Sequence, residues 1–175
     1  SVKFPKSLKS IVGFSDCRKL KNIEISEGVE RIGYDHTFRR SNWNRTFIGW
    51  ESLTELVIPS TVKEFNVCMD YHETEMYRKK MYTAKNIYFL GEDTNLNLYW
   101  IYWPDGNGYS VPEYEKIYPP VKDISEFYNS FSNASIMPYL GKPNIYCYED
   151  SIVANLKNDF PDYFNVQYIT SDTKI

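Results

Sequence analysis

One short stretch of this 175-residue chain carries side chains that could bind a metal ion. It is the segment DYHETE, in which Asp70, His72, Glu73 and Glu75 supply carboxylate and imidazole groups, which are common metal ligands. Their spacing matches no known ligand motif, and the chain has only two histidines. We interpret the stretch as a solvated loop and expect neither a metal ion nor a cofactor.

The sequence also lacks the arrangements on which nucleophilic and phosphate chemistry depends. It contains no serine nucleophile elbow, no HExxH zinc motif and no glycine-rich phosphate loop. A catalytic pair could be hidden among the 23 Asp and Glu residues, but the sequence does not single one out. We therefore expect a protein without catalytic activity.

Aromatic side chains are the most unusual chemical feature, at 17% of the chain. The run 99–103 reads Tyr-Trp-Ile-Tyr-Trp, and alternate residues of a β-strand point to opposite faces. Trp100 and Tyr102 are therefore expected on one face, and Tyr99 and Trp103 on the other. One face would pack against the protein, while the other would offer its rings to a sugar or a protein. Alternatively, these rings close the end of the hydrophobic core.

These rings belong to a predicted β-hairpin over 95–118. Strand-forming residues precede the turn cluster Pro-Asp-Gly-Asn-Gly at 104–108, and an extended segment follows it. Pro112 is expected to place the returning strand at a sheet edge, because proline cannot donate a ladder hydrogen bond. A short helix is predicted next, with apolar residues at helical spacing over 124–131.

The elements that must position these residues repeat along the chain. The segment LTELVIPSTVKEF at 53–65 aligns without gaps with LKNIEISEGVERI at 20–32, and their apolar positions coincide. The segment VKFPKSLKSI at 2–11 aligns in the same way with IEISEGVERI at 23–32. Apolar residues alternate within each copy, which is typical of strands with one buried face. The predicted strand cores are Val2/Phe4, Ile23/Ile25, Leu56/Ile58 and Ile87/Phe89.

Repeats of this size are typical of solenoids, in which each coil buries its apolar face against its neighbours. We predict an α/β solenoid of about four coils, mostly β with short helices. The segments Tyr34–Thr46 and Asn66–Tyr77 separate the two halves of a repeat and are predicted to loop out of the stack. The segment 149–160 is predicted to form a helix, capped by Asp150 or Ser151.

The repeat resembles the BspA-type bacterial leucine-rich repeats. These are marked by the pattern Phe-x-x-Cys-x-x-Leu-x-x-Ile-x-Ile-Pro-x-x-Val-x-x-Ile. Two copies match it, at Phe14, Cys17, Leu20, Ile23, Ile25, Val29 and Ile32, and at Phe47, Trp50, Leu53, Leu56, Ile58, Pro59, Val62 and Phe65. The first copy has Ser26 in place of proline, and a fainter third copy has Arg78 and Asp93 in place of Phe and Val.

This resemblance implies a single leucine-rich-repeat domain over 1–175. Its parts would be repeats at 2–96, an irregular insert with a hairpin and a short helix at 97–143, and a strand–helix–strand cap at 144–175. It also implies an exported or surface-attached bacterial protein, located outside the cell, that binds a protein or a host surface as an adhesin does.

Composition and charge argue against some classes of binding partner. The net charge is −3 and basic residues are dispersed, which argues against a nucleic-acid partner. No apolar run is long enough to span a bilayer. The three cysteines, Cys17, Cys68 and Cys147, fit neither a disulfide framework nor a zinc pattern, so we expect buried free thiols.

The outward residues of the predicted strands supply the candidate binding site. In a leucine-rich solenoid they line a concave face, and extended concave surfaces are what such proteins use for binding. The row is Lys3, Glu24, Val57, Tyr88 and Tyr146. Its mixed chemistry does not name a ligand, and the expected partner is a protein or a glycan on a cell surface or matrix. The alternative is a carbohydrate-binding protein that uses the aromatic hairpin.

Overall fold

The described part of the chain is made almost entirely of β-strands. The computed structural model describes residues 1–12, 17, 19–33, 52–70, 84–102, 113–118, 143–159, 161 and 164–175, without the side chains of 67–70, 98–102 and 113–118. The strands are β1 (Val2–Lys3), β2 (Ser10–Ile11), β3 (Ile23–Glu24), β4 (Arg31–Ile32), β5 (Glu55–Ile58), β6 (Glu64–Asp70), β7 (Asn86–Phe89), β8 (Asn95–Tyr102), β9 (Glu113–Tyr118), β10 (Asn144–Cys147) and β11 (Asn165–Tyr168). Among the described residues, helix is found in one segment, where the 3-10 turn η2 (Ile152–Asn155) continues into α3 (Leu156–Asp159).

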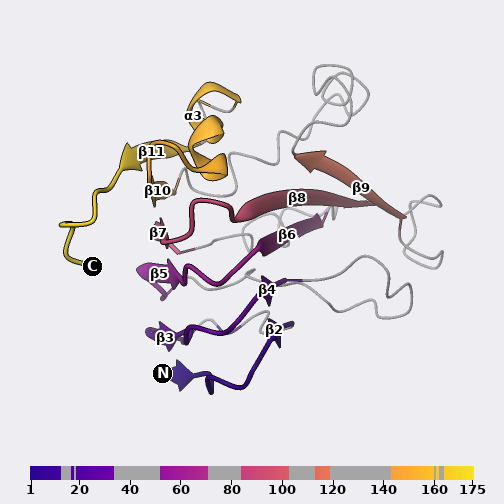
Figure 1. The fold of residues 1–175 in the computed structure, drawn as a ribbon. Coiled ribbons are helices and arrows are strands. Elements are labelled where there is room, and N and C mark those ends of the chain that lie inside the picture. The colour runs from indigo at the N-terminus through magenta and orange to yellow at the C-terminus, as the bar shows by residue number, and fades with distance from the viewer. Residues whose placement is uncertain are drawn as a thin grey trace.

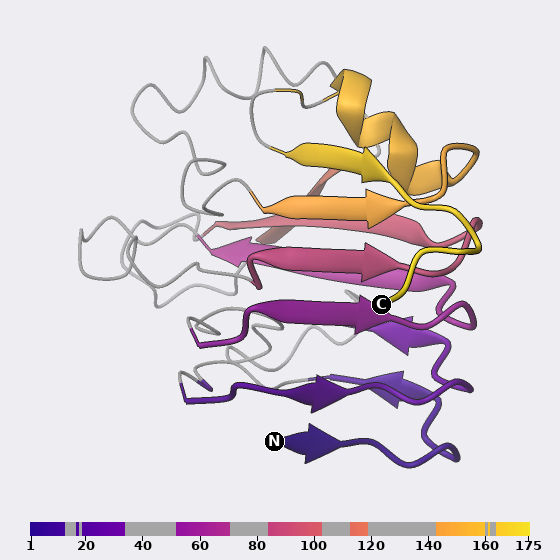
Figure 2. The same ribbon diagram turned by 90° about the vertical axis from the view of Figure 1, so that its left-hand side faces the viewer.

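The strands lie in two layers, between which the chain passes repeatedly (Figure 1). We call the layer with β1, β3, β5, β7, β10 and β11 the front layer. It contains the pair β1-β3 and a sheet in the order β11-β10-β7-β5, while the back layer is one sheet in the order β2-β4-β6-β8-β9. Figure 2 shows the outer side of the front layer. Every pairing is parallel except that of β8 with β9.

Strand pairing reproduces the repeat that the sequence predicts. In the front layer Val2 pairs with Ile23, and in the back layer Ile11 pairs with Ile32, as the alignment of the first two copies requires. Ile32 pairs in turn with Phe65, which holds the same position in the following copy. A strand-rich, repeat-like arrangement with mostly parallel sheets is therefore confirmed.

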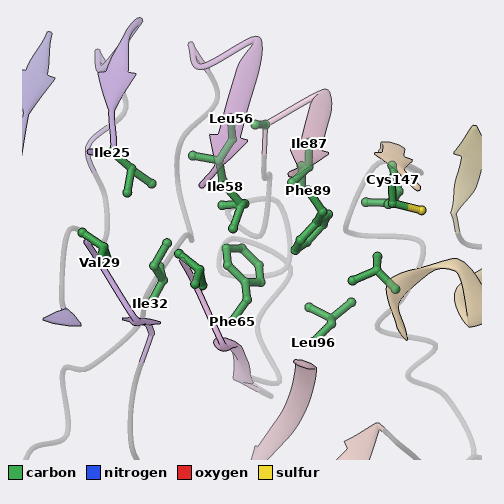
Figure 3. Close-up of a cluster of buried hydrophobic side chains, with 14 of the residues drawn as sticks. Ile25, Val29, Ile32, Leu56, Ile58, Phe65, Ile87, Phe89, Leu96 and Cys147 are labelled. Atoms are coloured by element: carbon green, nitrogen blue, oxygen red, sulfur yellow. The ribbon is translucent and has the colours of Figure 1, made fainter. Parts of the chain in front are cut away.

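Apolar side chains from both layers meet in one core (Figure 3). Leu20, Leu53 and Ala84, which the repeat aligns at one position ahead of the front strands, are all buried. Phe65 of the back layer packs edge-on against Phe89 of the front layer, with ring centroids 5.4 Å apart. Each fully buried apolar side chain of this size contributes about 1.5–3 kcal/mol to folding, so the shared core holds the two layers together.

A tight turn links the front strand to the back strand in the copies at 2–11, 20–32 and 53–65. In each turn the fourth residue donates its N–H to the carbonyl of the first, in the pairs Leu8–Pro5 (3.0 Å), Val29–Ser26 (3.4 Å) and Val62–Pro59 (3.1 Å). Ser26, which replaces the proline of the pattern, donates its hydroxyl to the Phe4 carbonyl at 2.7 Å. This side-chain bond joins the first two copies.

The fainter copy, which has Asp93 in place of valine, departs from the pattern at the corresponding turn. Asp93, which stands where the pattern has valine, is exposed and pairs with Lys63 at 2.5 Å. Thr94 is fully buried instead, and its hydroxyl donates to the Val62 carbonyl at 2.8 Å. The buried position is therefore filled by the following residue, with its hydroxyl satisfied as burial requires.

One predicted boundary is wrong. The segment from Asn66 was expected to loop out, but β6 continues to Asp70 and pairs with β8 along its whole length. β8 in turn extends to Tyr102 and includes most of the first strand predicted for the hairpin. A hydrogen bond between two polar side chains allows this continuation. The Asn97 side-chain amide donates to the side-chain oxygen of Asn66 at 2.8 Å, and both residues are buried. Strand pairing thus continues where the apolar pattern stops.

The C-terminal part has the predicted order of strand, helix and strand. β10 pairs with β7 on one side and with β11 on the other. Ser151 precedes the helical segment as expected, but its hydroxyl donates to the Tyr148 carbonyl and caps no helical N–H. Val153 and Leu156 are fully buried, so the segment covers part of the core.

Several expectations fall on residues outside the described ranges. They concern the predicted loop Tyr34–Thr46, the helix at 124–131 and the metal-ligand stretch beyond Asp70. Among the residues that are described, no helix combines the length and the apolar character needed to cross a membrane.

Candidate functional site

The five residues of the predicted binding row lie on the outer side of the front layer. Lys3 pairs with Glu24 in one part, and Val57, Tyr88 and Tyr146 are successive partners in the other. Their strand neighbours on either side, such as Leu56 and Ile58 or Ile87 and Phe89, are buried in the core. Because strand side chains alternate, the row must face outward. Gln167 of β11 pairs with Tyr146 and extends it. We call these six residues the outer row.

The outer row has two parts, since β3 and β5 belong to different sheets. Figures 1 and 2 both place these strands next to each other. Side chains connect their turns: the Gly28 N–H donates to the Thr61 hydroxyl at 2.9 Å, and that hydroxyl donates to the Val29 carbonyl at 2.8 Å. The first part is an ion pair, in which Nζ of Lys3 lies 2.6 Å from Oε1 of Glu24. The second part is apolar and aromatic.

The aromatic part is built around two stacked tyrosines. The rings of Tyr88 and Tyr146 are 4.4 Å apart between centroids, with 11° between their planes. That separation is close to the spacing of neighbouring strands, about 4.8 Å, so the rings stack along the direction that crosses the strands. One face of each ring is therefore turned toward the other ring. Both rings are half-buried, as is Val57.

Burial raises the pKa of the Tyr88 hydroxyl, and the nearby Glu55 carboxylate and Tyr146 raise it further. All three effects disfavour the phenolate, either by removing it from water or by placing it near negative charge. Tyr88 therefore presents a neutral hydroxyl, which can both donate and accept a hydrogen bond.

A second row of amides runs beside the outer row. Asn144 donates to the side-chain oxygen of Asn86 at 2.8 Å, and Asn165 donates to that of Asn144 at 3.1 Å. These three residues begin β7, β10 and β11 and occupy one register position. Glu55 of β5 is the partner of Asn86 and ends the row. Sequence reasoning missed the amides, although the tripeptide Asn-Ile-Tyr occurs at the start of both β7 and β10.

Glu55 differs from the other strand carboxylates whose side chains are described. Glu24 pairs with Lys3, and Glu64 pairs with Arg31 at 2.8 Å. Glu55 is exposed, and its carboxylate forms no hydrogen bond or ion pair with the side chain of any described residue. Within the aromatic part of the outer row and the amide row, it is the one charged side chain.

The last residues of the chain approach the same side of the molecule. Residues 170–175 follow β11 and are all exposed. Both ribbon views place the C-terminus at the level of β5 on the outer side of the front layer (Figures 1 and 2). A label or tag at this end would therefore lie close to the outer row.

The predicted aromatic hairpin forms as a backbone element. β8 and β9 pair antiparallel, with Trp100 opposite Glu115 and Tyr102 opposite Glu113. The directions of the Tyr99, Trp100 and Tyr102 side chains are outside the description, and so is Trp103 itself. These rings are therefore not placed relative to the outer row.

Of the cysteines whose side chains are described, Cys147 is buried and Cys17 is half-buried. Cys147 is fully buried, and this burial raises the pKa of its thiol, which a hydrogen bond with Ser151 only partly offsets. A thiol that stays protonated is a poor nucleophile. Cys17 is a half-buried free thiol. The expectation of a buried thiol is thus confirmed for Cys147, and Cys17 is more accessible than predicted.

The front layer therefore presents two parallel rows, one of tyrosines with Val57 and one of amides ending at Glu55. Such a surface can hydrogen-bond and can bury apolar groups, and nothing in the geometry of these described residues resembles a reaction centre. No protein-family model, no curated protein and no solved structure matches the chain.

Proposed function

We propose that this chain is a non-catalytic binding module of an exported or surface-attached bacterial protein. It would be built as a short leucine-rich-repeat solenoid of the BspA type and would bind a protein on a host or cell surface through the outer row. The pairing of Ile11 with Ile32, and of Ile32 with Phe65, supports the repeat assignment, because these residues hold one pattern position in successive copies. The adhesin-like role comes from the resemblance of the repeat alone.

One observation carries the proposal. Val57, Tyr88 and Tyr146 form an unbroken row of half-buried apolar and aromatic side chains on the outer side of a parallel sheet. The core is complete without them, since it is filled by their buried strand neighbours. Tyrosine is enriched in protein interfaces, and a few aromatic residues usually supply most of the binding energy.

The test uses the chain with a fluorescent label at its N-terminus, away from the aromatic part of the outer row. Binding to cultured cells and to immobilised matrix proteins is measured for the wild type and for the variant Tyr88→Ala/Tyr146→Ala. We expect the double variant to bind more than about tenfold more weakly, as for loss of an interface hot spot. The matched control is Tyr168→Ala, which removes a 41% exposed tyrosine from β11 that points away from the row.

Treatment of the target surface separates the two partner classes. Protease treatment should abolish binding and glycosidase treatment should spare it. If the double variant binds like the control, the outer row is not the site. Binding lost only on glycosidase treatment, and in Trp100→Ala, would instead support the second candidate, a carbohydrate-binding protein. The observation that favours this candidate is the antiparallel β8–β9 hairpin at the sheet edge.

A further inference from the structure

The chemistry of the outer side also bears on what kind of partner would fit it. Glu55 and Val57 are outward residues of the same strand, and their register partners on β7 are Asn86 and Tyr88. Glu55 and Tyr88 are therefore diagonal neighbours, about 7–8 Å apart at the backbone and within reach of long side chains. A carboxylate thus stands directly beside the apolar strip formed by Val57 and the two tyrosines.

Among the described residues, that carboxylate lacks the cation that comparable groups have. Four acidic side chains of the repeats pair with a cation, Glu24 with Lys3, Glu30 with Lys9, Glu64 with Arg31 and Asp93 with Lys63. A fifth, Glu27, accepts hydrogen bonds from Ser60 and Thr61. The register partner of Glu55 on the neighbouring strand β7 is Asn86, which is neutral. The described part of the row therefore offers an unmatched negative charge to an incoming molecule.

The geometry of the rings disfavours a sugar as that molecule. Sugars bind aromatic residues by lying on the ring face, and one face of each of these two rings is already covered by the other ring, with centroids 4.4 Å apart. The amides beside them are likewise bonded to one another, which uses part of their capacity for hydroxyl groups. Ring edges, hydroxyls and an apolar valine suit a polypeptide better.

We infer that the partner of the outer row is a polypeptide segment in which a lysine or arginine lies beside a large apolar residue. The cation would sit at Glu55, and the apolar side chain would cover Val57 and the edge of Tyr88. Charge complementarity selects this occupant over an acidic segment or an anionic glycan, which Glu55 would repel. The inference rests on the proposed binding function and assigns the partner's chemistry.

The experiment uses the full chain, labelled with ¹⁵N, and two synthetic peptides as probes. One peptide alternates arginine with leucine between Gly-Ser ends, and the other has glutamine in place of each arginine. We expect the arginine peptide to shift the amide resonances of Val57 and Tyr88, and to bind more tightly than the glutamine peptide. Maltohexaose, a neutral oligosaccharide, serves as the sugar probe and is expected to leave these resonances unchanged.

Variants then assign the cation to Glu55. Glu55→Gln should weaken the affinity for the arginine peptide by about 1.4- to fivefold, the range for a solvent-exposed ion pair, and should leave the affinity for the glutamine peptide unchanged. Glu149→Gln is the matched control, because it removes one exposed carboxylate from the turn after β10. Added salt should reduce the difference between the two peptides.

Each result bears on one of the two proposals. Equal binding of both peptides, an unchanged affinity in Glu55→Gln, or shifts at Val57 caused by maltohexaose would overturn the inference. The proposed function would still stand if Tyr88→Ala/Tyr146→Ala loses cell binding in that case. If the double tyrosine variant keeps full cell binding, then the proposed function fails regardless of the peptide data.

Discussion

Tyr88 is the residue of the outer row whose pKa is raised by its surroundings. Burial, Glu55 and Tyr146 all raise its pKa, so the folded protein disfavours the phenolate more than the unfolded chain does. A group with a raised folded-state pKa contributes its stability below the unfolded value, about 10 for tyrosine, and loses it as the pH rises. The free energy of unfolding should therefore fall across this range.

This sets a prediction for Tyr88→Phe, which removes the ionisable hydroxyl and keeps the ring. Urea unfolding between pH about 9 and 11 should show a steeper loss of stability in the wild type than in Tyr88→Phe. Tyr168→Phe, in an exposed residue of β11, should behave like the wild type. Parallel pH profiles for all three proteins would mean that Tyr88 is not held in its neutral form by the fold.

Single residues also show how far sequence reasoning reaches. The direction of Lys3, Glu24, Val57, Tyr88 and Tyr146 was predictable, because side-chain alternation in a strand allows no other face once its neighbours are buried. Their partners were not predictable. Ring stacking and amide hydrogen bonds depend on which strands pair and in what register, and the front layer brings together residues up to 58 positions apart.

At the scale of elements, the turns decide where each strand begins. Gly28 lies in the turn between β3 and β4 with a φ of +107°, which disfavours residues with a side chain. A Cβ at this position would also lie 2.8 Å from the Lys6 carbonyl oxygen of the preceding copy. The corresponding position of that first copy is Ser7, which tolerates a side chain. Both the left-handed backbone at Gly28 and the close approach of two stacked turns therefore favour glycine.

Gly28→Ala is accordingly expected to lower the free energy of unfolding by about 1–3 kcal/mol, the cost of strained backbone at a non-glycine residue. Thermal and urea unfolding would measure it. Ser7→Ala is the matched control at the same turn position and should change stability by less than about 0.5 kcal/mol. A Gly28→Ala variant as stable as that control would show that the turn can relax away from Lys6.

Element boundaries were the weakest part of sequence reasoning, for an identifiable reason. The apolar pattern indicated where strands face the core, but β6 and β8 continue beyond it through a buried pair of asparagines. Polar side chains are typical of loops in a sequence, and only the hydrogen bond between Asn66 and Asn97 makes their burial acceptable. At the turn after β7, a shift of one residue likewise put Thr94 in the place expected for Asp93.

At the scale of the whole molecule, the two layers share one hydrophobic core. Leu56 of the front layer is 2% exposed, and Phe65 of the back layer belongs to the same buried cluster. The short strands β1 to β4 have two residues each, too few for a sheet to be stable by itself. The described repeats should therefore unfold as a cooperative unit, in which damage to one layer is felt in the other.

Leu56→Ala tests this coupling, because it opens a cavity on the front side of the shared core. It should cost about 2–5 kcal/mol, whereas Val12→Ala, at a 45% exposed position, should cost less than about 0.5 kcal/mol. Native-state hydrogen exchange should then show equal losses of protection for amides in β7 of the front layer and in β6 of the back layer. Loss confined to β5 and β7 would mean that the layers open independently, and that the outer row can come apart while the back layer stays folded.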